Sequence, residues 1–106
     1  MHDNLLTSLP DAIGSLTALS IADFSENSLS AVPGTIGSLV GLDSLRLDQN
    51  ALSTLPSSIG NLTELDILNI SHNQLTSLPA QIGQLSDLDS LDVKNNQLSV
   101  LPDTLA

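Results

Sequence analysis

A period of 23 residues runs through the whole chain and constrains its fold more than any other feature. One full unit lies within residues 42–65, LDSLRLDQNALSTLPSSIGNLTEL. Pro follows six residues after each repeat Asn, and Gly follows four residues after each Pro except at the fifth place, which holds Ala106. Several residue types locked to one period indicate an array of stacked repeats. The Asn that mark the period are Asn4, Asn27, Asn50, Asn73 and Asn96.

The repeating positions have physical reasons. Leu45 and Leu47 alternate with Arg46, which predicts a short strand whose leucines face a core. Stacked copies of this strand would form a parallel sheet with neighbours about 4.8 Å apart. Pro56 fixes φ where no sheet donor is needed, and Gly60 is expected to permit a tight coil. Apolar residues that follow Pro56 at spacings of three suit a short helical or 3₁₀ segment on the outer face.

The unit reads L-x-x-L-x-L-x-x-N-x-L-x-x-L-P-x-x-I-G-x-L-x-x, and with this pattern the chain resembles the leucine-rich repeat family. The version with LPxxIGxL is similar to the class in Scribble- and Erbin-type scaffolds, plant intracellular Ras-group proteins and many bacterial repeat proteins. The resemblance covers essentially the whole chain. It implies an α/β solenoid with a curved parallel sheet on the concave face and short 3₁₀, helical or irregular segments on the convex face. It also implies scaffold or recognition duty, without naming a partner.

A single domain over residues 1–106 is expected, because no linker or composition break divides the repeats. The first and last repeats are incomplete, and neither shows a clear polar cap of the kind that closes most solenoids. Two explanations stay open: the chain is a piece of a longer array, or its ends contact something.

The composition excludes several classes of function. Two Lys/Arg against twelve Asp/Glu give a formal charge of -10, and there is one Phe but no Trp or Tyr. Phosphate backbones would be repelled and bases would find no stacking platform, so no nucleic-acid partner is expected. The absence of Cys excludes disulfides and thiolate metal sites. No segment is apolar enough for a leader or a membrane span, so no membrane contact is expected. The compartment stays open between the cytoplasm, which is favoured, and a secreted protein whose leader has been removed.

The exposed strand positions are the candidate binding surface, since a solenoid presents them as a ladder of side chains on its concave face. These positions lie six, four and two residues before each repeat Asn, and Ile21 and Ile67 are their only large apolar side chains. The expected partner-binding residues are Ile21, Asp23, Ser44, Arg46, Asp48, Ile67, Asn69, Asp92 and Lys94. The repeat Asn column, in contrast, is interpreted as a structural ladder in which each amide bonds the backbone of a buried turn.

An acidic column lies seven residues before the repeat Asn, at Asp43, Asp66 and Asp89. Neighbouring carboxylates would repel by about 0.7 kcal/mol per pair in water. The column could hold Ca²⁺ or a basic segment of a partner, but a straight row does not converge on one point as calcium ligands do. A solvated rim is the favoured interpretation, and no metal or other cofactor is expected.

Catalysis is not expected. The two His, His2 and His72, belong to different repeats roughly 14 Å apart, so they cannot share a metal. Ser71 and His72 are chain neighbours that point to different sides of a strand, and no other base or acid is placed to activate the hydroxyl. Neither a nucleophile elbow nor a phosphate-binding glycine loop is present.

The leading hypothesis is therefore a non-enzymatic module that binds a protein partner of unknown identity across the concave face. The alternative is a structural element that self-associates, because end leucines and unpaired strand edges favour stacking or pairing of the ends.

Overall fold

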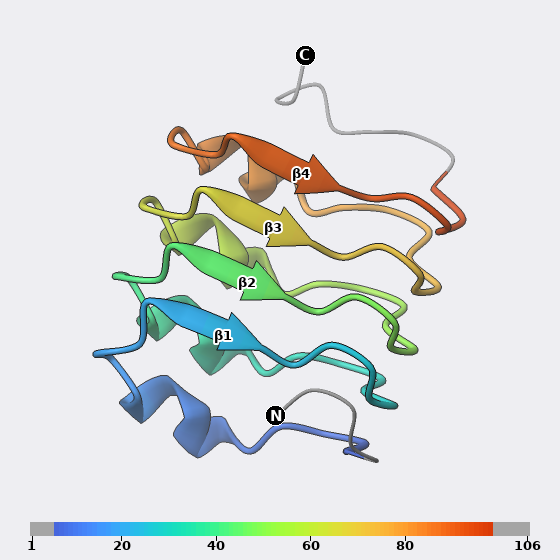
Figure 1. Ribbon diagram of the computed structural model, residues 1–106, viewed down its shortest axis with the longest axis horizontal. Coiled ribbons are helices and arrows are strands. Elements are labelled where there is room, and N and C mark those ends of the chain that lie inside the picture. Colours follow the sequence, from blue (N-terminus) through green and yellow to red (C-terminus); the bar gives the residue numbers. More distant parts are fainter. Residues whose placement is uncertain (1–5, 99–106) are drawn as a thin grey trace.

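The computed structural model describes residues 6–98, and within them similar coils stack along one axis (Figure 1). Each coil contributes a short 3₁₀ helix followed by a three-residue strand. The 3₁₀ helices are η1 (Asp11–Ser15), η2 (Gly34–Ser38), η3 (Ser57–Asn61) and η4 (Ala80–Gln84). The strands are β1 (Ile21–Asp23), β2 (Ser44–Arg46), β3 (Ile67–Asn69) and β4 (Ser90–Asp92). No helix in this part of the chain is long and apolar enough to cross a membrane.

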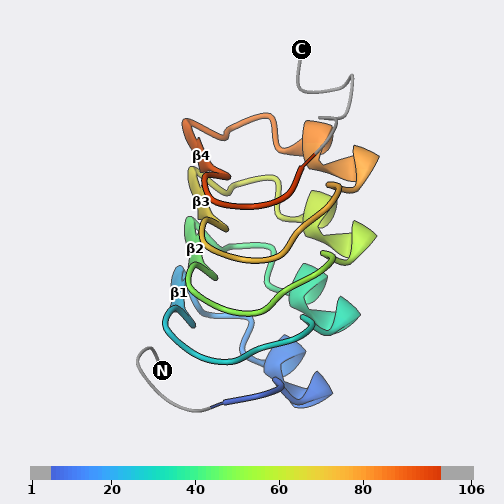
Figure 2. The ribbon, with the colours of Figure 1, turned by 90° about the vertical axis from the view of Figure 1, so that its right-hand side faces the viewer.

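The strands form one parallel sheet in the order β1-β2-β3-β4. Every pairing joins residues that are 23 apart, as in Ile21 with Ser44 and Ser44 with Ile67. The strands lie on one side of the stack and the 3₁₀ helices on the other (Figure 2). The predicted solenoid, a parallel sheet with short 3₁₀ segments opposite, is confirmed.

The apolar repeat positions fill the space between the two layers. The predicted inward orientation is confirmed for Ala22 and Phe24, and for the residues at the same positions of the next two repeats, Leu45, Leu47, Leu68 and Ile70. Burying such side chains contributes about 1.5–3 kcal/mol each, so the repeated leucines supply most of the driving force for stacking. Six apolar residues of the central repeat have no exposed surface at all: Leu45, Leu47, Leu52, Ile59, Leu62 and Leu65.

The repeat Asn bonds the backbones of its own coil and of the coil before it. The Nδ2 group of Asn73 donates to the carbonyls of Leu47, Ile70 and Ser71 at 3.0–3.1 Å. Its Oδ1 accepts from the N–H of Leu52 at 3.0 Å. Buried backbone groups that the irregular turns leave without a sheet partner are thereby satisfied. Bonds of the same type occur at Asn27, Asn50 and Asn96, and Asn4 lies outside the described residues.

The repeat Gly lies where neighbouring coils approach closely. No glycine of the described residues has a positive φ, so a left-handed backbone is not the reason for Gly at these positions. A Cβ on Gly60 would instead lie 2.6 Å from the carbonyl oxygen of Gln81 in the next coil. The corresponding distance is 2.7 Å from Gly37 to Ser58. Gly is therefore needed because neighbouring 3₁₀ helices approach too closely for any side chain.

The residue before each repeat Asn has left-handed backbone. The φ values are 57° at Glu26, 59° at Gln49, 55° at His72 and 58° at Asn95. This conformation is uncommon outside Gly, Asn and Asp, and it costs roughly 1 kcal/mol for other residues. It turns the chain sharply after the strand and brings the following Asn side chain into the interior.

Candidate functional site

The strand face, defined here as the outward side of β1–β4, carries two exposed aliphatic side chains in one row. Ile21 is 67% exposed and Ile67 is 45% exposed. The register places Ser44 between them and Ser90 on the far side of Ile67. Because they are two strands apart, the two isoleucines stand about 10 Å from one another. The structure thus brings the two apolar members of the predicted site into one row, separated by a small polar residue.

The second row of the strand face centres on Arg46. Its Nε and Nη2 atoms donate to the two carboxylate oxygens of Asp48 at 3.2 and 3.1 Å, and its Nη1 lies 3.7 Å from Asp23. The hydrogen bonds to Asp48 raise the pKa of Arg46 above its ordinary value. The charges of Asp48, Asp23 and Glu26 act in the same direction, and partial burial opposes them. The guanidinium is half-exposed, so it presents a fixed cation at the middle of the face.

The column two residues before the repeat Asn differs from the prediction. An outward position was expected, but Asp48 is only 3% exposed, and Ser25 and Ser71 are buried as well. The regular strand ends after three residues, and the chain then turns into the interior toward the left-handed residue. The expected surface role is therefore wrong for Asp48, whose carboxylate lies beneath Arg46. Lys94, in the last described repeat, is exposed.

The row of Asp23, Asn69 and Asp92 closes the strand ends. Oδ1 of Asn69 accepts from the N–H and the hydroxyl of Ser71, at 3.1 and 2.7 Å. At β2 the corresponding residues are Arg46 and Asp48. Because Arg46 cannot accept a hydrogen bond, it is the donor here, and Asp48 is the acceptor. The signal for this arrangement, an acceptor followed two residues later by Ser, is visible in the sequence but was missed. As at Asn69, the backbone N–H of Ser25 donates to Oδ1 of Asp23, and the backbone N–H of Lys94 donates to Oδ1 of Asp92.

The acid row, defined as Asp43, Asp66 and Asp89, runs along the strand starts. The N–H of Asp66 donates to the carbonyl of Asp43, and the N–H of Asp89 donates to that of Asp66, each at 2.8 Å. All three residues are exposed, and each directly precedes a residue of the row formed by Ile21, Ser44, Ile67 and Ser90. Among the residues that the structure describes, both ion pairs involve Arg46, and no group of three or more His, Asp or Glu is placed to hold a metal.

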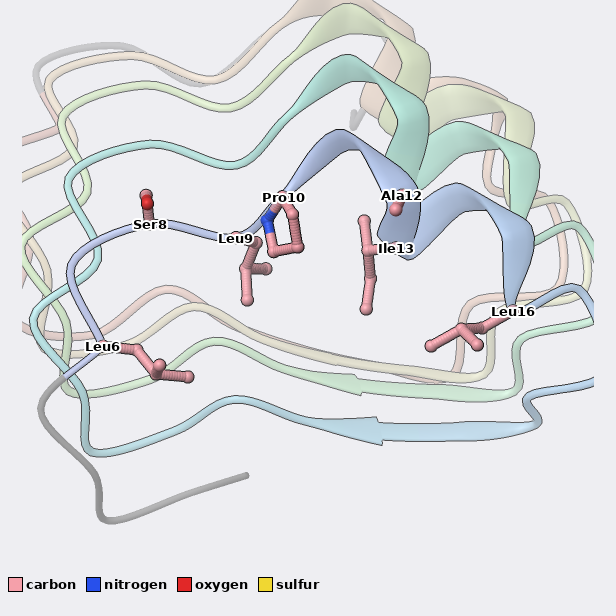
Figure 3. A pocket seen from close by; sticks show the side chains of 7 residues that line it. All are labelled: Leu6, Ser8, Leu9, Pro10, Ala12, Ile13 and Leu16. Carbon is pink, nitrogen blue, oxygen red and sulfur yellow. The ribbon is translucent and has the colours of Figure 1, made fainter.

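A hollow of about 270 Å³ opens on the first coil (Figure 3). The side chains of Leu6, Leu9, Ile13 and Leu16 point into the space that this coil encloses. Leu16 is 49% exposed, whereas Leu39, one repeat later, is completely buried. Leu9 and Ile13 are buried, so on this face of the described chain it is mainly Leu16 that meets solvent.

Comparisons with known proteins agree with this geometry. The family model described as Leucine rich repeat matches residues 41–98, which is more than half of the chain. Among solved structures, a leucine-rich repeat protein of Leptospira interrogans superposes with a TM-score of 0.94 at 35% sequence identity. The match covers 96% of this chain and 26% of that one, so the chain spans about a quarter of that protein's length. No curated protein shows a significant match. The proposed similarity to the Scribble and Erbin class stays a prediction.

Proposed function

The chain belongs to the leucine-rich repeat family, whose domains generally serve as non-enzymatic protein-interaction modules, and we propose that it binds a protein partner across the strand face. The observation that carries this proposal is the exposure of Ile21 and Ile67 in a row that otherwise holds serines. Large aliphatic side chains on an outward sheet surface gain free energy when a partner covers them.

The surroundings of the isoleucines favour recognition. The Asn ladder and the strand-end bonds hold the backbone where it leaves the strands, so little conformational entropy is lost there when a partner binds. Arg46 is held by Asp48 in a fixed orientation, and its planar guanidinium suits a carboxylate or carbonyl of the partner. Aliphatic contacts would supply affinity, and Arg46 would supply orientation.

The test uses a displayed library of random 12-residue peptides selected against the chain at physiological salt. Peptides that bind the strand face are expected to bind Ile67→Asp at least tenfold more weakly, because a buried unpaired carboxylate would replace the aliphatic contact. The matched control is Val40→Asp, which introduces the same charge at a residue that is 53% exposed outside the strands.

Binding that survives Ile67→Asp, or a selection that yields no peptide, would contradict the proposal. Both variants must first show the circular dichroism and the unfolding midpoint of the parent chain, so that lost binding is not lost folding.

A second candidate function is self-association, and the hollow on the first coil favours it. Leu16 exposes half of a side chain whose counterparts in later repeats are covered by the coil before them. A second copy stacked there would remove this apolar surface from water.

A further inference from the structure

We propose that the partner of the strand face presents a cationic segment, with aliphatic side chains against Ile21 and Ile67 and Lys or Arg side chains along the acid row. This inference rests on the proposed function and adds the chemistry of the partner. Its basis is the position of an exposed, unpaired row of carboxylates beside the one aliphatic row of the face.

The two rows are held side by side by the backbone. Asp66 and Ile67 are chain neighbours at the start of β3, and the N–H groups of both donate to the carbonyl of Asp43, at 2.8 and 3.1 Å. In the same way, the N–H groups of Asp89 and Ser90 both donate hydrogen bonds to the carbonyl of Asp66. A segment that lies across the strands and covers Ile67 therefore crosses the sheet next to the exposed residues of the acid row.

The charges along this edge are of one sign. Glu64 and Asp87 lie two residues before Asp66 and Asp89 and are exposed as well, so the edge gathers five carboxylates. Neighbouring strands are about 4.8 Å apart, so carboxylates of neighbouring strands repel by about the 0.7 kcal/mol per pair expected in water. Bringing any further negative charge to this edge would add to the repulsion, so an acidic partner is disfavoured.

The cations of the described chain do not neutralise the acid row. Arg46 is engaged by Asp48 and Asp23. Lys94 follows the end of β4, whereas Asp89 precedes its start, so the length of the strand separates them. A positively charged partner would therefore complement the acid row and relieve the repulsion between its carboxylates.

The selection described above supplies the probes for the test. Peptides whose binding depends on Ile67 are expected to be enriched in Lys and Arg, and to bind at least fivefold more weakly in 500 mM than in 50 mM NaCl. The variant Asp66→Asn/Asp89→Asn is expected to weaken them about three- to tenfold, since each exposed ion pair contributes modestly. The control Asp11→Asn/Asp103→Asn removes the same net charge without changing a residue of the acid row.

The possible outcomes separate the two proposals. Ile67-dependent peptides without basic residues, or equal weakening by both charge variants, would overturn the cationic partner and leave the strand face as the binding surface. A selection without Ile67-dependent peptides would remove both proposals. Loss of affinity in the Asp66→Asn/Asp89→Asn variant alone, with the control within twofold of the parent, would support the cationic segment.

Discussion

At the scale of single residues, Arg46 and Asp48 depend on each other. The carboxylate of Asp48 is almost completely buried, and the two bonds from Arg46 are the side-chain contacts that balance its charge. A buried charge without a partner is costly, although the half-exposed guanidinium keeps part of this pair in contact with water. In the other described repeats, Ser or Lys occupies the position of Asp48, so no buried carboxylate has to be paired there.

We therefore predict that Arg46→Asn lowers the free energy of unfolding by about 1–2 kcal/mol. Adding Asp48→Ser should restore it to within about 0.5 kcal/mol, because the resulting Asn–x–Ser pair is the one that closes β3. Urea unfolding at neutral pH measures both values, with Lys94→Asn as the control for losing one exposed cation. A double variant as unstable as the single one would show that the pair does not act through the buried charge.

The protonation of Arg46 makes this contribution insensitive to pH in the usual working range. The pKa of Arg46 is raised in the folded chain, mainly by its hydrogen bonds to Asp48. A raised pKa of a cation stabilises the fold below the unfolded value, and the effect is lost only as the pH rises through the folded value. Both values lie far above neutral pH, so Arg46 stays charged and its pairing persists.

At the scale of elements, the 3₁₀ helices of neighbouring coils pack closely against one another. Among the described elements each contacts only the 3₁₀ helices of the neighbouring coils, and the repeat Gly lies at the contact. At Gly60 the facing atom is a backbone carbonyl oxygen, which cannot move aside as a flexible side chain could.

Gly60→Ala should therefore lower the free energy of unfolding by about 1–3 kcal/mol, because the added methyl group forces η3 and η4 apart. Gly41→Ala is the matched control, since a Cβ at Gly41 would meet nothing within 4 Å. Its stability is expected to stay within about 0.5 kcal/mol of the parent. Equal denaturant midpoints for the two variants would contradict the close-packing explanation.

The sequence predicts the elements better than their ends. The strand centres at Leu45 and Leu68 and the helical segment after Pro56 follow directly from apolar spacing. The left-handed residue after each strand was not predicted, because Glu, Gln, His and Asn share no chemical property that marks it. That turn is set by the following Asn, whose side-chain amide must reach the interior to bond backbone carbonyls there. For the same reason the burial of Asp48 was missed while the exposure of Ile21 and Ile67 was expected.

At the scale of the whole molecule, the first coil differs from all later ones in the described chain. Leu16, which lines its apolar hollow, is 49% exposed, whereas the corresponding Leu39 and Leu62 of later repeats are completely buried. Whether this face binds a second copy determines whether the chain self-associates in addition to binding a partner at the strand face.

If copies stack on this face, the average mass measured by light scattering should rise over a hundredfold range of protein concentration. Leu16→Asp should then keep the mass of a single chain at every concentration, because stacking would bury the new charge. Val40→Asp, with the same charge at another exposed aliphatic residue, should still associate. A parent chain that keeps the mass of one copy throughout would remove self-association and direct the search to partners of the strand face.

The constant register of the sheet has a consequence for how such a chain changes over generations. Every strand pairing and every 3₁₀ contact in the described chain joins neighbouring coils only, and each pairing spans the same 23 residues. Gain or loss of one complete unit by recombination therefore recreates the same kinds of interface on both sides of the junction. A gain or loss of any other length would put leucines of the core on the surface. The fold thus tolerates heritable changes in length in whole units, and the strand face can widen one strand at a time.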